Sequence, residues 1–375
     1  TVAISSITQK EFFGRYDFFS GMTGTSSKKV FGEIFGKGTV EIPKNAFYSY
    51  YSKRKKQDAK EPLGILKKDT KYAIKNEDKI NLIINSIIES QQMNPKQPVL
   101  LVVSNFDEIK TLEEKLKEKN ISFNSLIATT SKEDEALIIS RAGREGSVTI
   151  STEMAGRGTD IKIGGDRETI IDIGLKRHIE LLEKKFNKPL ELTTSERDFL
   201  RKKVEKALAL KLWSKKEEKE SREKLELTGL KVISSGFFKM NRIDRQLEGR
   251  CGRNGVSGVC ERFVSIDDLK DLGLVSFNYK ESVEDFFNKF QKNIDNSLNI
   301  PDKTLKDMEE KIYNIQKNIE DSVKEEIKIS QRLNSYTTKI VEEYRDRRRK
   351  IITNQVDFKP IIDNYIEEAV NAIIS

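Results

Sequence analysis

Cysteine and histidine are almost absent from this chain of 375 residues. It contains two cysteines, Cys251 and Cys260, and one histidine, His178. That is too few for a disulfide framework, and the cysteines do not have the Cys-x-x-Cys spacing of a zinc site. No zinc is therefore expected, and a reducing compartment such as the cytoplasm suits the chain best. His178 lies among Lys and Glu in a helical pattern, so we expect it to be solvated.

Long apolar runs are lacking as well. No run approaches the roughly 20 apolar residues that a membrane span needs. The chain is 36% hydrophobic and 34% charged, and its length allows two or three domains with cores of their own. Its formal net charge of +8 favours contact with an acidic partner, either nucleic acid or anionic lipid, without choosing between them.

A phosphate-gripping loop of the G-x-x-x-x-G-K-[ST] type is also absent. The nearest match, residues 32–39, is one residue short and has glycine after its lysine. It also follows a helical pattern and precedes a strand, which is the reverse of a P-loop. Residues 134–137 look like an acidic metal-holding box, but no apolar strand precedes them and we expect them to begin a helix. Because the chain starts at Thr1 without a methionine, we expect it to be part of a longer protein.

Strand and helix patterns alternate from about residue 71. Residues 99–103 form a continuous run of valine and leucine, which is typical of a strand buried on both faces. Further strands are expected at 122–127, 148–151, 230–233 and 259–266. Helices are expected at 78–90, 106–119 and 132–141. This alternation predicts an α/β fold with a doubly wound parallel sheet.

Two segments place arginines beside glycines. Residues 151–160 read Ser-Thr-Glu-Met-Ala-Gly-Arg-Gly-Thr-Asp and follow an expected strand, where such sheets bind ligands. Residues 246–255 read Gln-Leu-Glu-Gly-Arg-Cys-Gly-Arg-Asn-Gly. Arginine supplies a permanent charge and a planar fork of donors that fits phosphate oxygens, and glycine lets the backbone approach closely. Both segments therefore indicate phosphate binding.

The second segment fits the Q-x-x-G-R-x-G-R pattern of helicase-type motor ATPases. Combined with Met-Ala-Gly-Arg-Gly-Thr-Asp-Ile at 154–161 and Arg-Ile-Asp at 242–244, it resembles the SecA family of preprotein translocase ATPases. The resemblance covers most of the chain up to about residue 350, with further matches at 20–25, 40–43, 97–100 and 262–268.

This resemblance implies a motor that uses ATP or ADP with Mg²⁺ as cofactors. In such motors the second of two RecA-like domains reaches arginines into a nucleotide bound on the first. Arg250 and Arg253 are then the candidate catalytic residues, three apart at the start of a helical turn and facing one neighbouring domain. The candidate nucleotide-binding residues are Gly156, Arg157, Gly158, Asp160, Gln246 and Gly249. The magnesium ligands are expected in the other half of the protein.

The resemblance also implies three parts. Residues 1–36 would end the first motor domain. Residues 37–274 would form the second RecA-like domain, with a helical insertion at about 166–228 and an exposed linker at 47–69. Residues 275–375 would form an α-helical scaffold and the start of the helical wing region, with helices at 281–299, 302–352 and 358–374. No strand is expected after Leu274.

Departures from the family pattern occur at Glu153, at 235–242 with Phe237 and Phe238, and at 256–258. They spare the arginines and indicate an accessory SecA. The implied partners are the membrane Sec channel, a secretory preprotein, an anionic lipid surface and a second copy in a homodimer. The implied place is the cytoplasm, peripheral on the inner face of the bacterial cell membrane.

Two other classes stay open. A superfamily 2 nucleic-acid helicase fragment would share the arginine motif and the positive charge, although the resemblance outside that motif argues against nucleic acid as the partner. A regulator without enzymatic activity would have kept the fold and lost the chemistry, against which the retained arginines speak. Stimulation of ATP hydrolysis by lipid and channel, and not by nucleic acid, separates the first two classes.

Overall fold

The computed structural model describes residues 12–18, 20–22, 40, 42, 65–105, 107–127, 130–153, 160–211, 214–225, 228–253, 256–278, 280–353 and 359–374. The chain divides into two units, Glu41–Ile319 and a second made of Thr1–Val40 with Glu320–Ser375. Gly156, Arg157, Gly158, residues 32–39 and residues 23–25 lie outside the described residues.

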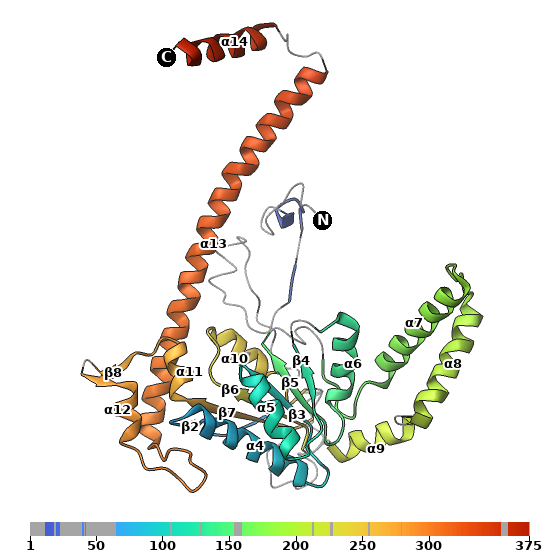
Figure 1. Cartoon of the computed structure of the whole chain (residues 1–375), viewed down its shortest axis with the longest axis vertical. Helices are drawn as coiled ribbons and strands as arrows, with labels where there is room; N and C mark the ends of the chain where they lie inside the picture. The colour runs from blue at the N-terminus through green and yellow to red at the C-terminus, as the bar shows by residue number, and fades with distance from the viewer. Residues whose placement is uncertain are drawn as a thin grey trace. The chain divides into compact units, whose positions relative to one another are not determined.

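The unit Glu41–Ile319 is built on a seven-stranded parallel sheet (Figure 1). Its strand order is β1-β7-β6-β3-β5-β4, and β2 pairs with β7 further along that strand. The strands are β1 Ile65–Lys67, β2 Lys71–Ala73, β3 Val99–Val103, β4 Asn124–Leu126, β5 Val148–Thr152, β6 Leu230–Ser235 and β7 Gly258–Ser265. The predicted doubly wound, RecA-like α/β fold is confirmed.

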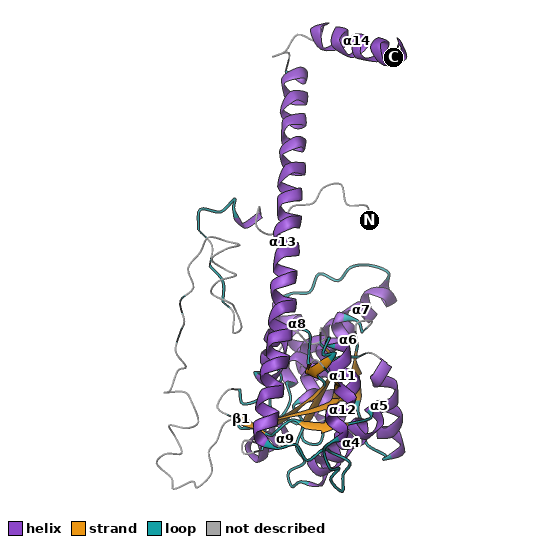
Figure 2. Ribbon diagram, turned by 90° about the vertical axis from the view of Figure 1, so that its left-hand side faces the viewer, coloured by secondary structure: helices purple, strands orange, loops and turns teal. Residues whose placement is uncertain are grey.

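Helices cover both faces of the sheet (Figure 2). Successive side chains of a strand point to opposite faces, so the apolar run of β3 serves two cores. Val99, Leu101 and Val103 pack with side chains of α4 and α5, whereas Leu100 and Val102 pack with those of α6 and α10. These helices are α4 Asn76–Gln92, α5 Asp107–Glu118, α6 Lys132–Ala142 and α10 Asn241–Glu248. The sequence patterns at 78–90, 106–119 and 132–141 predict the first three of these helices, with small differences at their ends.

Three helices lie between β5 and β6, on one side of the sheet beyond α6 (Figure 1). They are α7 Arg167–Phe186, α8 Thr194–Lys211 and α9 Lys215–Leu225. Asn187, in the left-handed conformation, ends α7 and lets the chain turn back into α8. The buried Arg167 joins the two helices through an ion pair of 2.9 Å with Glu205. His178 is exposed on α7, as expected.

The expectations for residues 275–299 are wrong. A hairpin of β8 Ser276–Asn278 and β9 Glu281–Ser282 follows Leu274, and the helix predicted at 281–299 is limited to α12 Val283–Asn288. The reason is tertiary. Phe277 stacks on Phe286 with 3.8 Å between ring centroids, and the N–H of Leu298 donates to the carbonyl of Tyr72 at 2.8 Å. These long-range contacts outweigh the local helical pattern.

Two smaller expectations have mixed outcomes. The strand β1 lies within the stretch 47–69 that was expected to be a linker, so that expectation is wrong at its end, and residues 47–64 lie outside the described residues. A strand of three residues is too short to show a period. Residues 134–137 do begin a helix, because Ser131 caps α6 by accepting from the N–H of Asp134.

The long helix α13 Asp302–Ile352 and the helix α14 Lys359–Ile374 have the predicted extents. Within the first unit, Met308 and Ile312 of α13 are buried against side chains of α11 Ile266–Asp271 and α12. Beyond Ile319 the helix belongs to the second unit. Among the described helices, none is both long and apolar enough to cross a membrane.

Hydrogen exchange along α13 should be uneven. Met308 and Ile312 are each 1% exposed, whereas Ile340 and Tyr344 are 66% and 69% exposed. A helical amide beside a packed side chain exchanges only when the core opens, so we expect slow exchange around Ile312 and fast exchange toward Arg345. Mass spectrometry of peptides from the intact chain measures this gradient. Equally fast exchange over the whole helix would mean that its first part is not anchored in the core.

Candidate functional site

Arg250 and Arg253 lie just after the end of a helix, whereas the sequence predicts the start of a helical turn for them. Helix α10 ends at Glu248, and the N–H of Gly249 donates back to the carbonyl of Arg245. Residues 249–253, here called the arginine turn, lead from α10 toward β7. A Cβ atom at Gly258 would lie 2.6 Å from the Cβ of Cys251, so this glycine lets the arginine turn pack directly against the first residue of β7.

Arg253 is held by two hydrogen bonds. Its Nη1 donates to Oδ1 of Asp160 at 2.8 Å, and its Nε donates to the carbonyl of Gly249 at 2.7 Å. Two predicted site residues, 93 positions apart in the sequence, are thus in contact. Both side chains are 40% exposed, so the ion pair contributes at most about 1 kcal/mol. Arg253 can therefore exchange Asp160 for another anion at little cost.

Arg250 borders two small cavities beside the arginine turn. One is shared with Arg253, Cys251 and Arg222, so both candidate arginines face the same space. The other is shared with Thr152 and Glu153 at the carboxyl end of β5. The structure therefore brings the ends of the two arginine–glycine segments together. Gln246 lies half-buried on α10, and Gly249 is exposed.

The charges at this site fit an anion. Three arginines, Arg222, Arg250 and Arg253, border one cavity, and a phosphate accepts hydrogen bonds from the planar fork of a guanidinium group. The nearby carboxylate of Asp160 is paired with Arg253. Among the described residues, no group of three or more His, Cys, Asp or Glu side chains is placed to hold a metal ion.

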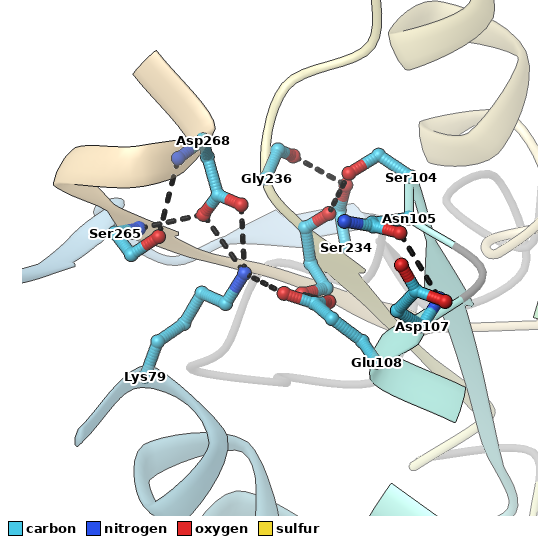
Figure 3. Close-up of polar contacts among 10 residues, drawn as sticks. Lys79, Ser104, Asn105, Asp107, Glu108, Ser234, Gly236, Ser265 and Asp268 are labelled. Carbon is cyan, nitrogen blue, oxygen red and sulfur yellow. Dashed lines mark hydrogen bonds and ion pairs between the residues drawn. The ribbon is translucent and has the colours of Figure 1, made fainter. Parts of the chain in front are cut away.

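A buried ionic cluster at the topological switch point was missed by the sequence analysis (Figure 3). Strands β3 and β6 are neighbours, but the helices that follow them, α5 and α10, pack on opposite faces of the sheet. Sheets of this class bind ligands at such points. Here Nζ of Lys79 donates to both carboxylate oxygens of Asp268, at 2.8 and 2.9 Å, and also to Glu108. Oγ of Ser235 donates to the second oxygen of Glu108 at 2.6 Å.

The polar groups of this cluster satisfy one another. Lys79 is fully buried and Glu108 is 4% exposed. Asp268 also accepts from the N–H of Ser265 and so completes the capping box in which Ser265 caps α11, while Ser104 donates to the carbonyl of Ser235. The cluster therefore ties α4, α5 and α11 to the strand ends, and its role is structural. The sequence contains one indication of this cluster, because Lys79 lies four residues before Ile83, on the apolar face of α4.

A third polar contact joins α13 to α10. Nε2 of Gln316 donates to Oδ2 of Asp244 at 2.7 Å and to the carbonyl of Phe238 at 2.6 Å. Arg262 donates to Oδ1 of Asp244 at 3.0 Å, and its guanidinium lies over the ring of Phe237. Burial raises the pKa of Asp244, against the lowering effect of Arg262. The helix that precedes the arginine turn is thus fixed to the long helix by a buried hydrogen-bonded group.

Replacing Gln316 tests this contact. Gln316→Ala leaves a buried carboxylate oxygen and a buried carbonyl without their donor, so we expect the free energy of unfolding to fall by about 2 kcal/mol. The neighbouring Lys317 is exposed, and Lys317→Ala should change it by less than about 0.5 kcal/mol. Urea denaturation followed by circular dichroism gives both values. Equal values for the two variants would contradict the assigned role.

A family profile and the similar curated proteins all point to one family. A profile described as "SecA P-loop domain" matches residues 65–293. The protein translocase subunit SecA of Cutibacterium acnes is 34% identical over 269 residues, which is 71% of this chain and 26% of that protein. Its counterpart from Bartonella bacilliformis is 29% identical over 267 residues, covering 71% of this chain and 25% of that protein.

A solved structure also matches, although weakly. It is the E. coli DEAD-box protein SrmB bound to regulator of ribonuclease activity A, with 15% identity and a TM-score of 0.33 over 60% of this chain and 89% of that one. A TM-score of 0.33 is too low to support a conclusion about this chain. The chain spans about a quarter of the length of the curated relatives it matches. Because the SecA profile matches more than half of its residues, the chain belongs to the SecA family.

Proposed function

We propose that this chain supplies the second motor domain and the helical scaffold of an ATP-driven preprotein translocase. The domain boundaries are those expected from the resemblance, near residues 36 and 274. The observation that carries the proposal is the convergence of Arg250 and Arg253 on one cavity, with Arg253 held by Asp160. The relatives named protein translocase subunit SecA support the class of motor. The phosphate loop and the magnesium ligands then belong to another part of the intact protein.

The two arginines act in this proposal on the phosphates of an ATP molecule bound across a domain interface. Bound ATP with Mg²⁺ supplies the phosphoryl group that is transferred to water. Positive charge is needed where negative charge builds on the transferred and leaving groups. Arg253 breaks its ion pair with Asp160 and pairs with a phosphate instead, so that one anion replaces another. Asp160 then serves to hold the guanidinium in readiness when no phosphate is present.

The remaining parts of the proposal concern the whole protein. The partners are the Sec channel, a secretory preprotein and an anionic lipid surface, on the inner face of the cell membrane, and a homodimer is proposed as well. Phe237 and Phe238, where the sequence departs from the family pattern, support the accessory type. Phe238 is buried, and Phe237 lies under the guanidinium of Arg262.

Stimulation of ATP hydrolysis tests the class of the motor. We expect anionic vesicles that contain the Sec channel to raise the ATP turnover of the intact protein, and single-stranded or duplex nucleic acid to leave it unchanged. Turnover raised by nucleic acid alone would replace this proposal with the helicase alternative.

The 375-residue chain by itself should not turn over ATP. Two arginines stabilise a transition state only after the triphosphate and magnesium are held, and no phosphate loop of the required pattern is present in this sequence. We expect hydrolysis at the level of a buffer blank and only weak binding of ATP. A coupled assay on the purified chain checks this result. Appreciable hydrolysis that survives further purification would contradict the assignment.

A further inference from the structure

The two cysteines of the chain are neighbours in space. Sγ of Cys251 lies 3.0 Å from Sγ of Cys260, and neither is in a disulfide. Cys251 stands in the arginine turn between Arg250 and Arg253, and Cys260 is the third residue of β7. Their residues are 2% and 8% exposed. Because Gly258 lets the arginine turn pack against β7, both sulfur atoms are held in contact.

The surroundings of the pair favour a reactive thiol at Cys251. The hydrogen bond between the two sulfur atoms lowers the pKa of Cys251, against the raising effects of burial and of Glu248, and the charge of Arg253 acts in the lowering direction. That same hydrogen bond, together with burial, raises the pKa of Cys260, which therefore keeps its proton. Cys251 also forms part of the wall of the cavity that Arg250 and Arg253 border. We take this cavity as the route by which a molecule as small as hydrogen peroxide approaches Cys251.

We propose that Cys251 and Cys260 are an oxidation site, at which peroxide closes a reversible disulfide under the arginine turn. The thiolate of Cys251 attacks one peroxide oxygen, the O–O bond breaks, and Cys251 becomes a sulfenic acid while hydroxide takes up the proton that the thiol released. The sulfur of Cys260 then attacks that of Cys251, the S–O bond breaks, and the Cys260 proton leaves in water. Two thiols and one peroxide give one disulfide and two waters, with two electrons passing to oxygen.

The bond would move the arginine turn. A disulfide is about 2.05 Å long, so the sulfur atoms must approach by about 1 Å. A displacement of that size at a catalytic group can cost about 100-fold in rate. Such a switch agrees with a reducing compartment, where disulfides are transient and redox-sensing. The effect on turnover rests on the function proposed for the arginines, whereas formation of the bond does not.

The first measurement reads the bond alone. The 375-residue chain is treated with hydrogen peroxide, its remaining thiols are alkylated, and it is analysed by intact mass and by peptide mapping without reduction. We expect the loss of two hydrogen atoms, one peptide pair joined through Cys251 and Cys260, and full reversal by dithiothreitol. In Cys260→Ser no joined pair can form, and a dimedone adduct should appear at Cys251. Absence of the joined pair, at peroxide levels that oxidise a free thiol peptide, would overturn the proposal.

The second measurement reads the consequence in the intact protein. Oxidation should lower ATP turnover at least about tenfold, and dithiothreitol should restore it. The Cys260→Ser variant cannot join the turn to β7, so peroxide should not cause this loss of turnover in it. A disulfide that forms with turnover unchanged would overturn the regulatory part while leaving the oxidation site in place. The function proposed for the arginines is judged separately, by the Arg253 variants described below, so the two failures can be told apart.

Discussion

Arg253→Ala is expected to lower the ATP turnover of the intact protein by at least about 100-fold, because an arginine supplied across an interface contributes on the order of 10³ to 10⁵ in rate. Folding and ADP binding should be nearly unchanged. Arg253 is 40% exposed and its ion pair with Asp160 contributes little to stability. Steady-state hydrolysis, thermal melting and ADP titration of one preparation provide the three values.

Two further variants sharpen this test. Arg253→Lys should not restore turnover, since an ammonium group lacks the planar fork of donors. Arg245→Ala removes an exposed arginine from the last turn of α10, eight residues before Arg253, and should leave turnover close to that of the parent protein. An alanine variant of Arg253 that melts early, or that hydrolyses ATP at the parent rate, would show the residue to be structural.

Lys79→Met should have the largest effect on stability, a loss of about 3 to 5 kcal/mol, because it leaves Glu108 and Asp268 buried without their shared cation. The matched control is Lys176→Met, since Lys176 is 62% exposed and pairs with Glu133 on the surface. That variant should change the free energy of unfolding far less than Lys79→Met does, because both partners of the surface pair stay in water. Urea denaturation of both variants measures the difference. Similar losses for both would mean that the buried cluster does not tie the helices to the strand ends.

The parts of the fold that the sequence predicted are those with a clear local period. Strand β3 is a run of apolar residues wide enough to fill two cores, and α13 repeats its apolar residues by threes and fours over 51 residues. Strands β1, β2, β8 and β9 have two or three residues each, and no period can be seen in so few. Their position depends on contacts with β7 or with the aromatic side chains around Phe277, which only the folded chain brings together.

The candidate site could be predicted as a set of residues but not as an arrangement. The patterns around Asp160 and Arg253 each indicate phosphate chemistry, yet nothing in either segment shows that the two side chains meet. The same holds for Lys79 with Asp268, 189 positions apart, and for Gln316 with Asp244. Each of these pairs is set by strand order and helix packing. The neighbouring thiols of Cys251 and Cys260 likewise follow from the close packing that Gly258 permits.

The central claim is that the arginine turn acts on a nucleotide bound by another part of the intact protein. A structure of that protein with ADP, Mg²⁺ and a metal-fluoride analogue of the transferred phosphate tests it most directly. We expect the guanidinium of Arg253 to have left Asp160 and to lie at hydrogen-bond distance, about 3 Å, from the analogue, with Arg250 beside it. An Arg253 that is still paired with Asp160, and more than about 6 Å from the analogue, would contradict the claim.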